Sequence, residues 1–179
     1  MATRIRLFGM DVDGVLTDNA VYVGSVNGDR VEFKRFDIQD GLGLAILRNT
    51  DIRVAWMSGR ESDATRLRAE ELKIPDVMQI RGAAKLPVMT DLMNRLGIDW
   101  PEIAFIGDDL ADLPILRRCG LPIAVANAVP EVLECAALVT RAKGGQGAVR
   151  EAIEALLKAR GTWDDAVRGY LRERGDDNA

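Results

Sequence analysis

The stretch from Leu7 to Asp18 constrains this chain more than any other part of the sequence. Apolar residues run up to Asp11, a second carboxylate follows at Asp13, and Gly14 then lets the backbone turn. A short apolar run that ends at a turn signal is typical of a buried strand. Side chains two positions apart in a strand point to the same side, so Asp11 and Asp13 are expected to converge at its carboxyl end. Taken alone, such a pair either lies in solvent or holds a cation, and Mg²⁺ prefers oxygen ligands of this kind.

The composition indicates a globular protein and excludes several kinds of chemistry. At 179 residues, 47% hydrophobic and 29% charged, the chain suits one domain with a substantial core. The formal net charge is −4 and no long basic run occurs, so we expect no nucleic-acid partner and no anionic membrane surface. The sequence contains no histidine, which excludes Ser-His-Asp and Cys-His catalysis and most zinc sites. Carboxylates, Lys85 and arginines are left to carry any catalysis.

The cysteines and the beginning of the sequence predict a cytoplasmic protein. Cys119 and Cys135 each lie in an apolar neighbourhood without the spacing of a metal site, which is typical of reduced core residues. The apolar run before Asp11 is too short for a signal peptide or a membrane span. We therefore expect a cytoplasmic location and no membrane partner.

A predicted hairpin interrupts the connection that should follow the first strand. Residues 20–23 and 31–36 are β-prone, and Asn27-Gly28 between them is a strong signal for a tight turn. An isolated hairpin is marginal in water, and this one carries apolar residues on both faces. Either it folds back on its own domain or another surface covers it. These apolar residues are Val21, Tyr22, Val23, Val31, Phe33 and Phe36.

Predicted helices and strands alternate from residue 42 onward. The predicted helices cover residues 42–48, 61–72, 84–96, 108–119 and 147–159, with a short one beginning at Pro130 and a weak last one around Trp163. The predicted strands cover residues 53–57, 77–80, 103–106, 123–125 and 138–140. This alternation predicts an α/β fold, a doubly wound, Rossmann-like parallel sheet covered on both faces. Asp11, Ser58 and Asp108 each follow a strand, so they should meet at the carboxyl edge of that sheet.

The domain organisation that we predict is simple. Residues 1–161 form a single domain, with the hairpin insertion at about 19–36 and no large cap domain. Residues 162–179 form a C-terminal helix and a frayed tail. The run from Gly144 to Gly147 lacks the Lys-Ser/Thr ending of a nucleotide-binding loop, which argues against nucleotide binding.

Four segments carry a resemblance to the haloacid dehalogenase superfamily of phosphatases. The run from Asp11 to Asp18 resembles motif I of that superfamily, and Ser58-Gly59-Arg60, Lys85 and the run from Gly107 to Asp112 resemble its later motifs. The resemblance covers roughly residues 4 to 160. Within the superfamily, the chain is most similar to the phosphatases of octulosonate 8-phosphate and to relatives that act on nonulosonate 9-phosphates.

The resemblance implies a role for each site residue. Asp11 is the nucleophile that forms an aspartyl-phosphate, and Asp13 is the general acid and base. Mg²⁺ is held by Asp11, by the backbone carbonyl of Asp13 and by Asp108, while Ser58 and Lys85 bind the phosphate that is transferred. The supporting residues are Asp109 and Asp112, which hold metal-bound waters or orient loops. Without the resemblance, a residue such as Ser58 is more often a helix cap and one such as Lys85 more often a surface lysine. A solvated helix start explains the acidic run equally well.

The residues expected to bind the rest of the substrate come from the same resemblance. They are Asp37, Asp40, Gly41, Ser58, Gly59, Arg60, Arg68 and Lys85. Three arginines implied by the resemblance are replaced here by Gln39, Ala45 and Gln146. A neutral side chain cannot grip a carboxylate as an arginine fork does, so we predict weaker selection for the sugar-acid carboxylate. Alternatively, Arg66 or a basic residue of a neighbouring subunit fills the gap.

These observations together predict a Mg²⁺-dependent phosphatase of a small phosphorylated sugar acid. The apolar hairpin and the resemblance further predict a homotetramer with hairpins packed around its axis. One alternative is another phosphatase specificity on the same scaffold, such as a nonulosonate 9-phosphate or another small sugar phosphate. A second is a regulatory or assembly module that has lost turnover, against which the intact set of Asp11, Asp13, Lys85 and Asp108 argues.

Overall fold

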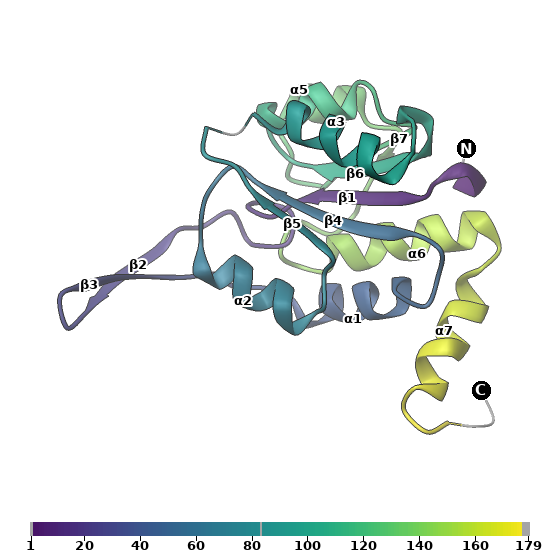
Figure 1. Cartoon of the computed structure of the whole chain (residues 1–179), viewed down its shortest axis with the longest axis horizontal. Helices are drawn as coiled ribbons and strands as arrows, with labels where there is room; N and C mark the ends of the chain where they lie inside the picture. The colour runs from purple at the N-terminus through teal and green to yellow at the C-terminus, as the bar shows by residue number, and fades with distance from the viewer. Residues whose placement is uncertain (1, 83, 177–179) are drawn as a thin grey trace.

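The chain folds around one parallel sheet (Figure 1). The structure is a computed structural model that describes residues 2–82 and 84–176. In sheet order, the strands within the described residues are β5 (Asp76–Gln79), β4 (Arg53–Ser58), β1 (Leu7–Asp11), β6 (Ile103–Gly107), β7 (Leu121–Ala124) and β8 (Leu138–Val139). Every neighbouring pair in this sheet is parallel. The predicted α/β fold with a doubly wound parallel sheet is confirmed.

The first strand lies in the middle of the sheet, where the strand order reverses. β1 pairs with β4 on one side and with β6 on the other. Every residue of β1 is buried, as the continuous apolar run predicts for a central parallel strand. Ligands of such sheets bind outside the carboxyl ends of the strands at this reversal point. The fold therefore places the end of β1, and with it Asp11, at the expected ligand position.

Helices cover both faces of the sheet (Figure 1). One layer contains α1 (Ile38–Leu47), α2 (Asp63–Glu71), α6 (Ala148–Arg160) and α7 (Trp163–Arg172). The other contains α3 (Lys85–Leu96), α4 (Leu113–Leu116) and α5 (Pro130–Cys135). The described residues also form short 3-10 helices, which are η1 (Ala2–Arg4), η2 (Trp100–Glu102) and η3 (Leu110–Asp112). Part of the predicted frayed tail, residues 177–179, lies outside the described residues, and the boundary at 161 stays a prediction.

The hairpin forms at the predicted turn and extends away from the body of the domain (Figure 1). It consists of β2 (Tyr22–Val26) and β3 (Asp29–Phe33), which are antiparallel. Asn27 and Gly28 have φ angles of 53° and 88°, the positive values that a two-residue hairpin turn of type I′ requires. Its own domain covers only the base, where Phe36 packs against the core, and leaves the rest of the hairpin uncovered. The exposed apolar side chains are Val21, Tyr22, Val23, Val26 and Phe33. At its base, a bridge between Thr17 and Phe36 ties the hairpin to the sheet domain.

Two predicted segments differ in the structure. The helix predicted for residues 42–48 begins earlier, at Ile38, because the Asp37 side chain accepts a hydrogen bond from the Gln39 amide and caps the helix. Gly41 and Gly43 lie in that helix, and the low helix propensity of glycine argues against a helix there. A Cβ at Gly43 would lie 3.1 Å from the Arg150 Cα atom, so α1 and α6 pack closely at this glycine. The single helix predicted for residues 108–119 is instead the short pair η3 and α4.

Candidate active site

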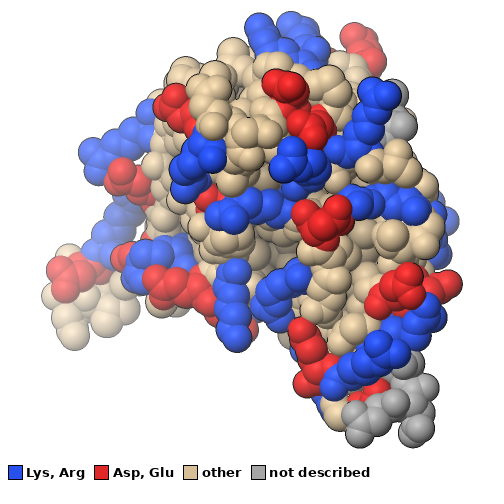
Figure 2. All heavy atoms as spheres, turned by 45° about the vertical axis from the view of Figure 1, so that its right-hand side comes forward, with Lys and Arg blue, Asp and Glu red and all other residues tan. Residues whose placement is uncertain are grey.

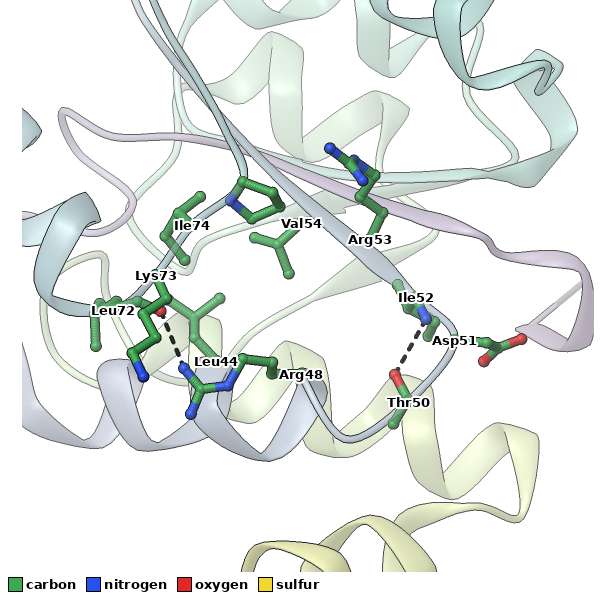
Figure 3. A pocket seen from close by; sticks show the side chains of 11 residues that line it. Leu44, Arg48, Thr50, Asp51, Ile52, Arg53, Val54, Leu72, Lys73 and Ile74 are labelled. Carbon is green, nitrogen blue, oxygen red and sulfur yellow. Dashed lines mark hydrogen bonds between the residues drawn. The ribbon is translucent and has the colours of Figure 1, made fainter. Parts of the chain in front are cut away.

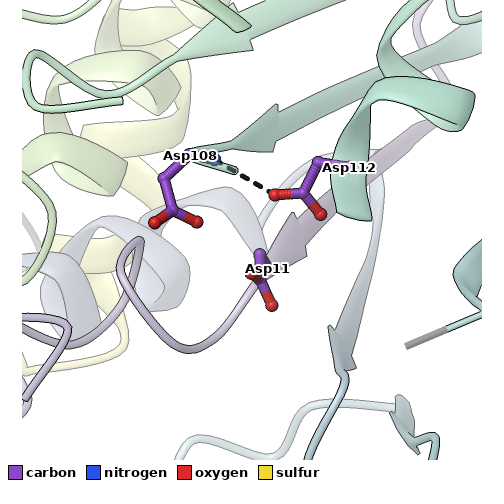
Figure 4. Close-up of side chains that lie close together, drawn as sticks. All are labelled: Asp11, Asp108 and Asp112. Atoms are coloured by element: carbon purple, nitrogen blue, oxygen red, sulfur yellow. Dashed lines mark hydrogen bonds between the residues drawn. The ribbon is translucent and has the colours of Figure 1, made fainter. Parts of the chain in front are cut away.

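Carboxylates from separate elements meet at the carboxyl edge of the sheet (Figure 4). Asp11 ends β1, Asp108 follows β6, and Asp112 ends η3. Oxygen atoms of the three carboxylates lie within 4.8 Å of one another, and all three residues are buried. Like charges that are this close together and this well shielded from water are unfavourable unless positive charge balances them.

Lys85 supplies part of that balance. It is the first residue of α3, and its Nζ atom lies 2.7 Å from Asp11 Oδ1 and 2.7 Å from Asp112 Oδ1. The Lys85 side chain is 2% exposed, so its two ion pairs replace the water it has lost. The prediction that Lys85 belongs to the site agrees with this position, and the reading of Lys85 as a surface lysine is wrong.

Backbone geometry brings the Asp108 carboxylate close to Asp11. The Asp112 Oδ2 atom accepts hydrogen bonds from the amides of Asp108 and Asp109, at 3.1 and 3.5 Å, which folds the loop after β6 around it. Gly14 faces Asp108 with a φ of +92°, and a Cβ at that glycine would lie 2.0 Å from Asp108 Oδ2. The glycine of the first motif is therefore needed both for the turn and for the space that Asp108 fills.

Burial and mutual repulsion shift the acid–base properties of these groups. Burial, with the charge of Asp112, raises the pKa of Asp11 to about 7, although Lys85 opposes the shift. Burial, with the charges of Asp11 and Asp112, raises the pKa of Asp108 to about 8. Burial alone would lower the pKa of Lys85, but the charges of Asp11 and Asp112 raise it above its usual value. The site favours uptake of positive charge, either as protons or as a cation.

The donor set fits a divalent hard cation. Three carboxylates and one ammonium group leave two excess negative charges when all are ionised. Asp108 Oδ1 is buried without a hydrogen-bond partner, so one oxygen atom of the cluster is unsatisfied. Both Asp112 oxygen atoms already accept hydrogen bonds, which leaves Asp11 and Asp108 as the better ligands. Such a set of carboxylate oxygens is typical of Mg²⁺ sites.

Asp13 is held on both sides by residues from other elements. Its Oδ2 atom accepts a hydrogen bond of 2.8 Å from the Ser58 hydroxyl at the end of β4. Its Oδ1 atom lies 2.6 Å from Nζ of Lys34, which follows β3 and also donates to Thr65 of α2 at 3.0 Å. Sequence reasoning missed Lys34 and Thr65. Lys34 lies in the β-prone stretch of the predicted hairpin, where a charged side chain is expected to point into solvent. No local signal in the sequence distinguishes it from a solvated lysine.

The second motif places its residues beside a groove. Ser58 is fully buried, and its hydroxyl oxygen also accepts a hydrogen bond of 3.0 Å from the Arg60 amide, whereas the N-cap position of α2 is Ser62. Ser58 is therefore not the helix cap of the alternative interpretation. Arg60 pairs with Glu32 of the hairpin at 2.9 Å, and both line an open groove of about 590 Å³ between β3 and the start of α2.

Other residues expected to bind substrate have different partners. Asp40 is buried, and its Oδ1 atom accepts a hydrogen bond of 2.8 Å from the amide of Arg150 in the first turn of α6. The Asp37 carboxylate caps α1, and Gly41 lies against Arg68, which pairs with Glu71 on α2 at 2.8 Å. Their assignment as substrate-binding residues stays a prediction.

Two of the positions that lack arginine lie together. Gln39 and Gln146 line one cavity of about 420 Å³ along α6, together with Arg141 and Arg150. Arg66 is engaged on the surface of α2, where it pairs with Asp63 and Glu70 at 3.2 and 2.9 Å. These pairs hold Arg66 within its own helix, and nothing in its contacts connects it with that cavity.

A separate cavity lies at the opposite edge of the sheet (Figure 3). It has a volume of about 250 Å³ and lies between the amino end of β4 and the carboxyl ends of α1 and α2. Arg48 donates from this cavity wall to the carbonyl of Leu72 at 3.4 Å, so its charge serves the end of a helix. The lining of this cavity contains one carboxylate, Asp51, unlike the buried carboxylate cluster. Figure 2 shows one face of the molecule, on which acidic and basic side chains are interspersed and exposed.

Comparison with known proteins supports the family resemblance that the sequence motifs carry. The sequence signature of the haloacid dehalogenase-like hydrolase family matches residues 74–153. The 3-deoxy-D-manno-octulosonate 8-phosphate phosphatase KdsC of Escherichia coli strain K12 is 41% identical over 165 residues, which are 92% of this chain and 86% of KdsC. The Yersinia pestis KdsC is 40% identical over 166 residues, 93% of this chain and 87% of that protein.

Solved structures extend the likeness to three dimensions. The crystal structure of the Moraxella catarrhalis 3-deoxy-D-manno-octulosonate 8-phosphate phosphatase, in complex with a magnesium ion, a phosphate ion and a KDO molecule, has a TM-score of 0.88 at 38% identity. The alignment covers 94% of this chain and 95% of that one. The cobalt-bound phosphatase of Haemophilus influenzae has a TM-score of 0.84 at 37% identity, covering 95% and 98%.

The fold and the carboxylate site define a haloacid dehalogenase-like hydrolase. The chain belongs to that superfamily and, within it, to the family of the 3-deoxy-D-manno-octulosonate 8-phosphate phosphatases. The resemblance stated from the sequence is thereby confirmed. Within the part of the chain that the structure describes, no helix combines the length and the apolar character needed to cross a membrane.

Proposed function

We propose that the protein is a Mg²⁺-dependent phosphatase that hydrolyses 3-deoxy-D-manno-octulosonate 8-phosphate or a closely similar phosphorylated sugar acid. The observation that carries the proposal is the buried arrangement of Asp11, Lys85, Asp108 and Asp112 at the end of the central strand. Relatives that share about two fifths of their residues with this chain over most of its length are phosphatases of that substrate.

Asp11 acts as the nucleophile in the first half of the reaction. The Val12 amide and Lys85 hold its Oδ1 atom, at 2.6 and 2.7 Å, so Oδ2 is the oxygen that attacks phosphorus. A bond forms between Oδ2 and phosphorus while the bond to the sugar oxygen breaks. Protonated Asp13 gives its proton to that leaving oxygen, and the products of this step are an aspartyl-phosphate and the free sugar acid.

Asp13 reverses its role in the second half of the reaction. It takes a proton from the water molecule that attacks the aspartyl-phosphate, which frees Asp11 and inorganic phosphate. Lys85 and Ser58 lie beside the reacting carboxylates and neutralise charge on the transferred group. Asp112 keeps the Lys85 ammonium group in place and fixes the loop that carries Asp108.

Asp11, the backbone carbonyl of Asp13 and Asp108 would hold Mg²⁺. When bound, the cation neutralises the excess negative charge of the cluster and lets an anionic phosphate approach the anionic nucleophile. The unsatisfied Asp108 Oδ1 atom supports this assignment. Asp109 caps η3 through the Leu110 amide at 2.6 Å, so its part is to shape the loop.

We further propose that the protein is a cytoplasmic homotetramer in which hairpins pack around the symmetry axis. Exposed apolar side chains on both hairpin strands support this assembly. The described residues form no large cap domain, so the hairpin and a neighbouring subunit exclude water and select the substrate. The groove beside Arg60 and Gly59 is the expected position of the sugar.

The resemblance implies that this protein departs from its relatives in substrate choice. Gln39 and Gln146 line a common cavity, and neither can form a bidentate pair with a carboxylate. We propose that selection for the octulosonate carboxylate is weaker here than in family members that carry arginine at these positions.

A panel of phosphate esters tests the proposed function. Released phosphate is measured, with and without Mg²⁺, for octulosonate 8-phosphate, a nonulosonate 9-phosphate and simple hexose phosphates. The proposal expects Mg²⁺-dependent turnover, with a kcat/KM highest for a sugar-acid phosphate. The double variant Gln39→Arg with Gln146→Arg should raise the preference for octulosonate 8-phosphate. Absence of turnover on every ester would favour a regulatory or assembly module, and a high preference that the double variant does not change would contradict weakened selection.

A further inference from the structure

Lys34 brings the hairpin into contact with the acid–base residue. It follows the last residue of β3, where the hairpin joins the domain. Its Nζ atom lies 2.6 Å from Asp13 Oδ1 and donates to Thr65 Oγ1 at 3.0 Å. The Lys34 side chain is 3% exposed. A lysine this deeply buried is rare, and its charge must be matched by the groups around it.

A neighbouring cation of the hairpin behaves in the ordinary way. Arg30 lies four residues earlier, on the same side of the strand as Lys34, and pairs loosely with Glu32 at 3.7 Å. Its side chain is 73% exposed. Glu32 lies between them and its side chain is 16% exposed, so burial increases along this side of the hairpin toward the base, where Lys34 lies.

We propose that Lys34 is a positioning residue that fixes the carboxylate of Asp13 for proton transfer. The inference rests on the proposed phosphatase function. Lys34 holds Oδ1 and the Ser58 hydroxyl holds Oδ2, so the plane of the carboxylate is set from two different elements. Each oxygen atom keeps a further lone pair for the leaving oxygen or the attacking water.

This placement makes the chemistry depend on the hairpin. Thr65 is fully buried in α2 and fixes the Lys34 ammonium group from the other side. A shift of the hairpin base would move Nζ, and Asp13 would lose one of its two anchors. Misplacement of a catalytic group by about 1 Å can lower a rate by about a hundredfold.

The test separates proton transfer from general loss of function. Lys34→Met keeps the length of the side chain and removes its charge, and Lys73→Met is the matched control, at an exposed lysine beside the cavity at the opposite edge of the sheet. Formation of the aspartyl-phosphate is measured in single turnovers with octulosonate 8-phosphate, whose alkyl leaving group needs a proton, and with 4-nitrophenyl phosphate, whose leaving group does not. We expect Lys34→Met to slow the alkyl ester by about a hundredfold and the aryl ester by less than about fivefold. Lys34→Arg, which keeps the charge, should recover part of the alkyl rate.

Equal losses on the two esters, or a Lys34→Met enzyme as fast as Lys73→Met, would overturn the proposal. If Lys34→Met does not fold, Thr65→Val removes one anchor of the ammonium group and should show the same selective loss, about threefold to tenfold on the alkyl ester. A Thr65→Val enzyme with equal rates of loss on both esters would likewise overturn it. Failure of the wild-type protein to hydrolyse either ester would instead contradict the proposed function itself.

Discussion

The carboxyl edge of the sheet and the hairpin break the usual distribution of side chains in opposite ways. At the edge, Asp108 and Lys85 are charged and buried, with 4% and 3% of their surface exposed. On the hairpin, Val23 and Phe33 are apolar and exposed, at 58% and 64%. Buried charges and exposed apolar residues are each unfavourable in an isolated chain. Both regions therefore indicate a partner, a cation and an anion at the edge and another protein surface at the hairpin.

The two regions also differ in how rigidly they are built. The edge is fixed by ion pairs, by capped turns and by parallel strands on both sides of β1. The hairpin is fixed at its base, through the bridge of Thr17 with Phe36 and the stacking of Phe36 on Trp56 with ring centroids 6.4 Å apart. A preformed site suits chemistry, whereas a projecting strand pair suits assembly.

Removal of the nucleophile should have the largest effect. Asp11→Asn keeps the size of the side chain but removes the attacking charge, so kcat should fall by at least about a thousandfold. Steady-state phosphate release measures this. Asp91→Asn, an exposed position on α3, is the control and should keep wild-type activity. An Asp11→Asn enzyme with more than a tenth of the wild-type rate would contradict covalent catalysis.

Metal binding should change stability as well as rate. The pKa values of Asp11 and Asp108, raised to about 7 and about 8, mean that the metal-free native state holds protons which the unfolded chain releases. Its stability therefore falls as the pH rises between about 4 and 8. Mg²⁺ needs ionised ligands and should raise the Tm more at pH 8 than at pH 5.

Calorimetry with and without Mg²⁺ at both pH values measures this difference. Asp108→Asn should lose most of the Mg²⁺ effect. Ca²⁺ should bind and yet inhibit, because its larger and looser shell misplaces the attacking oxygen. Full activity after exhaustive chelation would disprove the metal requirement.

The hairpin should control assembly. Burial of one Phe side chain contributes about 2 kcal/mol, so Phe33→Ser should weaken a tetramer enough to dissociate it at micromolar protein. Light scattering measures the mass, and Leu67→Ser, an exposed position on α2, is the control. An active wild-type monomer would show that the hairpin has another use.

The smallest effect is expected at Asp40. Burial raises the pKa of Asp40 to about 6, opposed by the hydrogen bond from the Arg150 amide. Stability should therefore fall by at most about 3 kcal/mol as the pH rises from 4 to 6. Asp40→Asn keeps an oxygen acceptor without a charge, so this part of the pH dependence should vanish in thermal melts. A kcat/KM reduced more than about twofold would instead support the substrate-binding role implied by the resemblance.

The sequence predicts most of the fold, because its strands are continuous apolar runs and its hairpin contains Asn27-Gly28. It predicts the ends of strands that carry Asp11, Ser58 and Asp108 for the same reason. It places the start of α1 too late, at residue 42 instead of 38, because Gly41 and Gly43 lie in this helix where residues of α2 and α6 pack closely against them. Tertiary packing outweighs intrinsic propensity there.

Residues whose role comes from long-range contacts were not predictable. Lys34 is indistinguishable from a surface lysine until the hairpin base and α2 are placed beside Asp13. The Asp40 contact with Arg150 joins positions 110 residues apart and leaves no local pattern. Motifs identify the groups that react, while the groups that hold them require the structure.

The close contact between Gly144 and Gly14 has a consequence for the order in which the protein becomes active. A Cβ at Gly144 would lie 1.7 Å from the carbonyl oxygen of Gly14, and the Gly145 amide donates to the Val15 carbonyl at 2.9 Å. The backbone at Gly144 and Gly145 thus packs directly against the backbone of the turn that follows Asp13. During translation, the nucleophile emerges from the ribosome first, but its loop gains this support only when residue 145 of 179 has followed. A nascent chain that already contains every catalytic side chain therefore remains incomplete as an enzyme until Gly144 and Gly145 have been added.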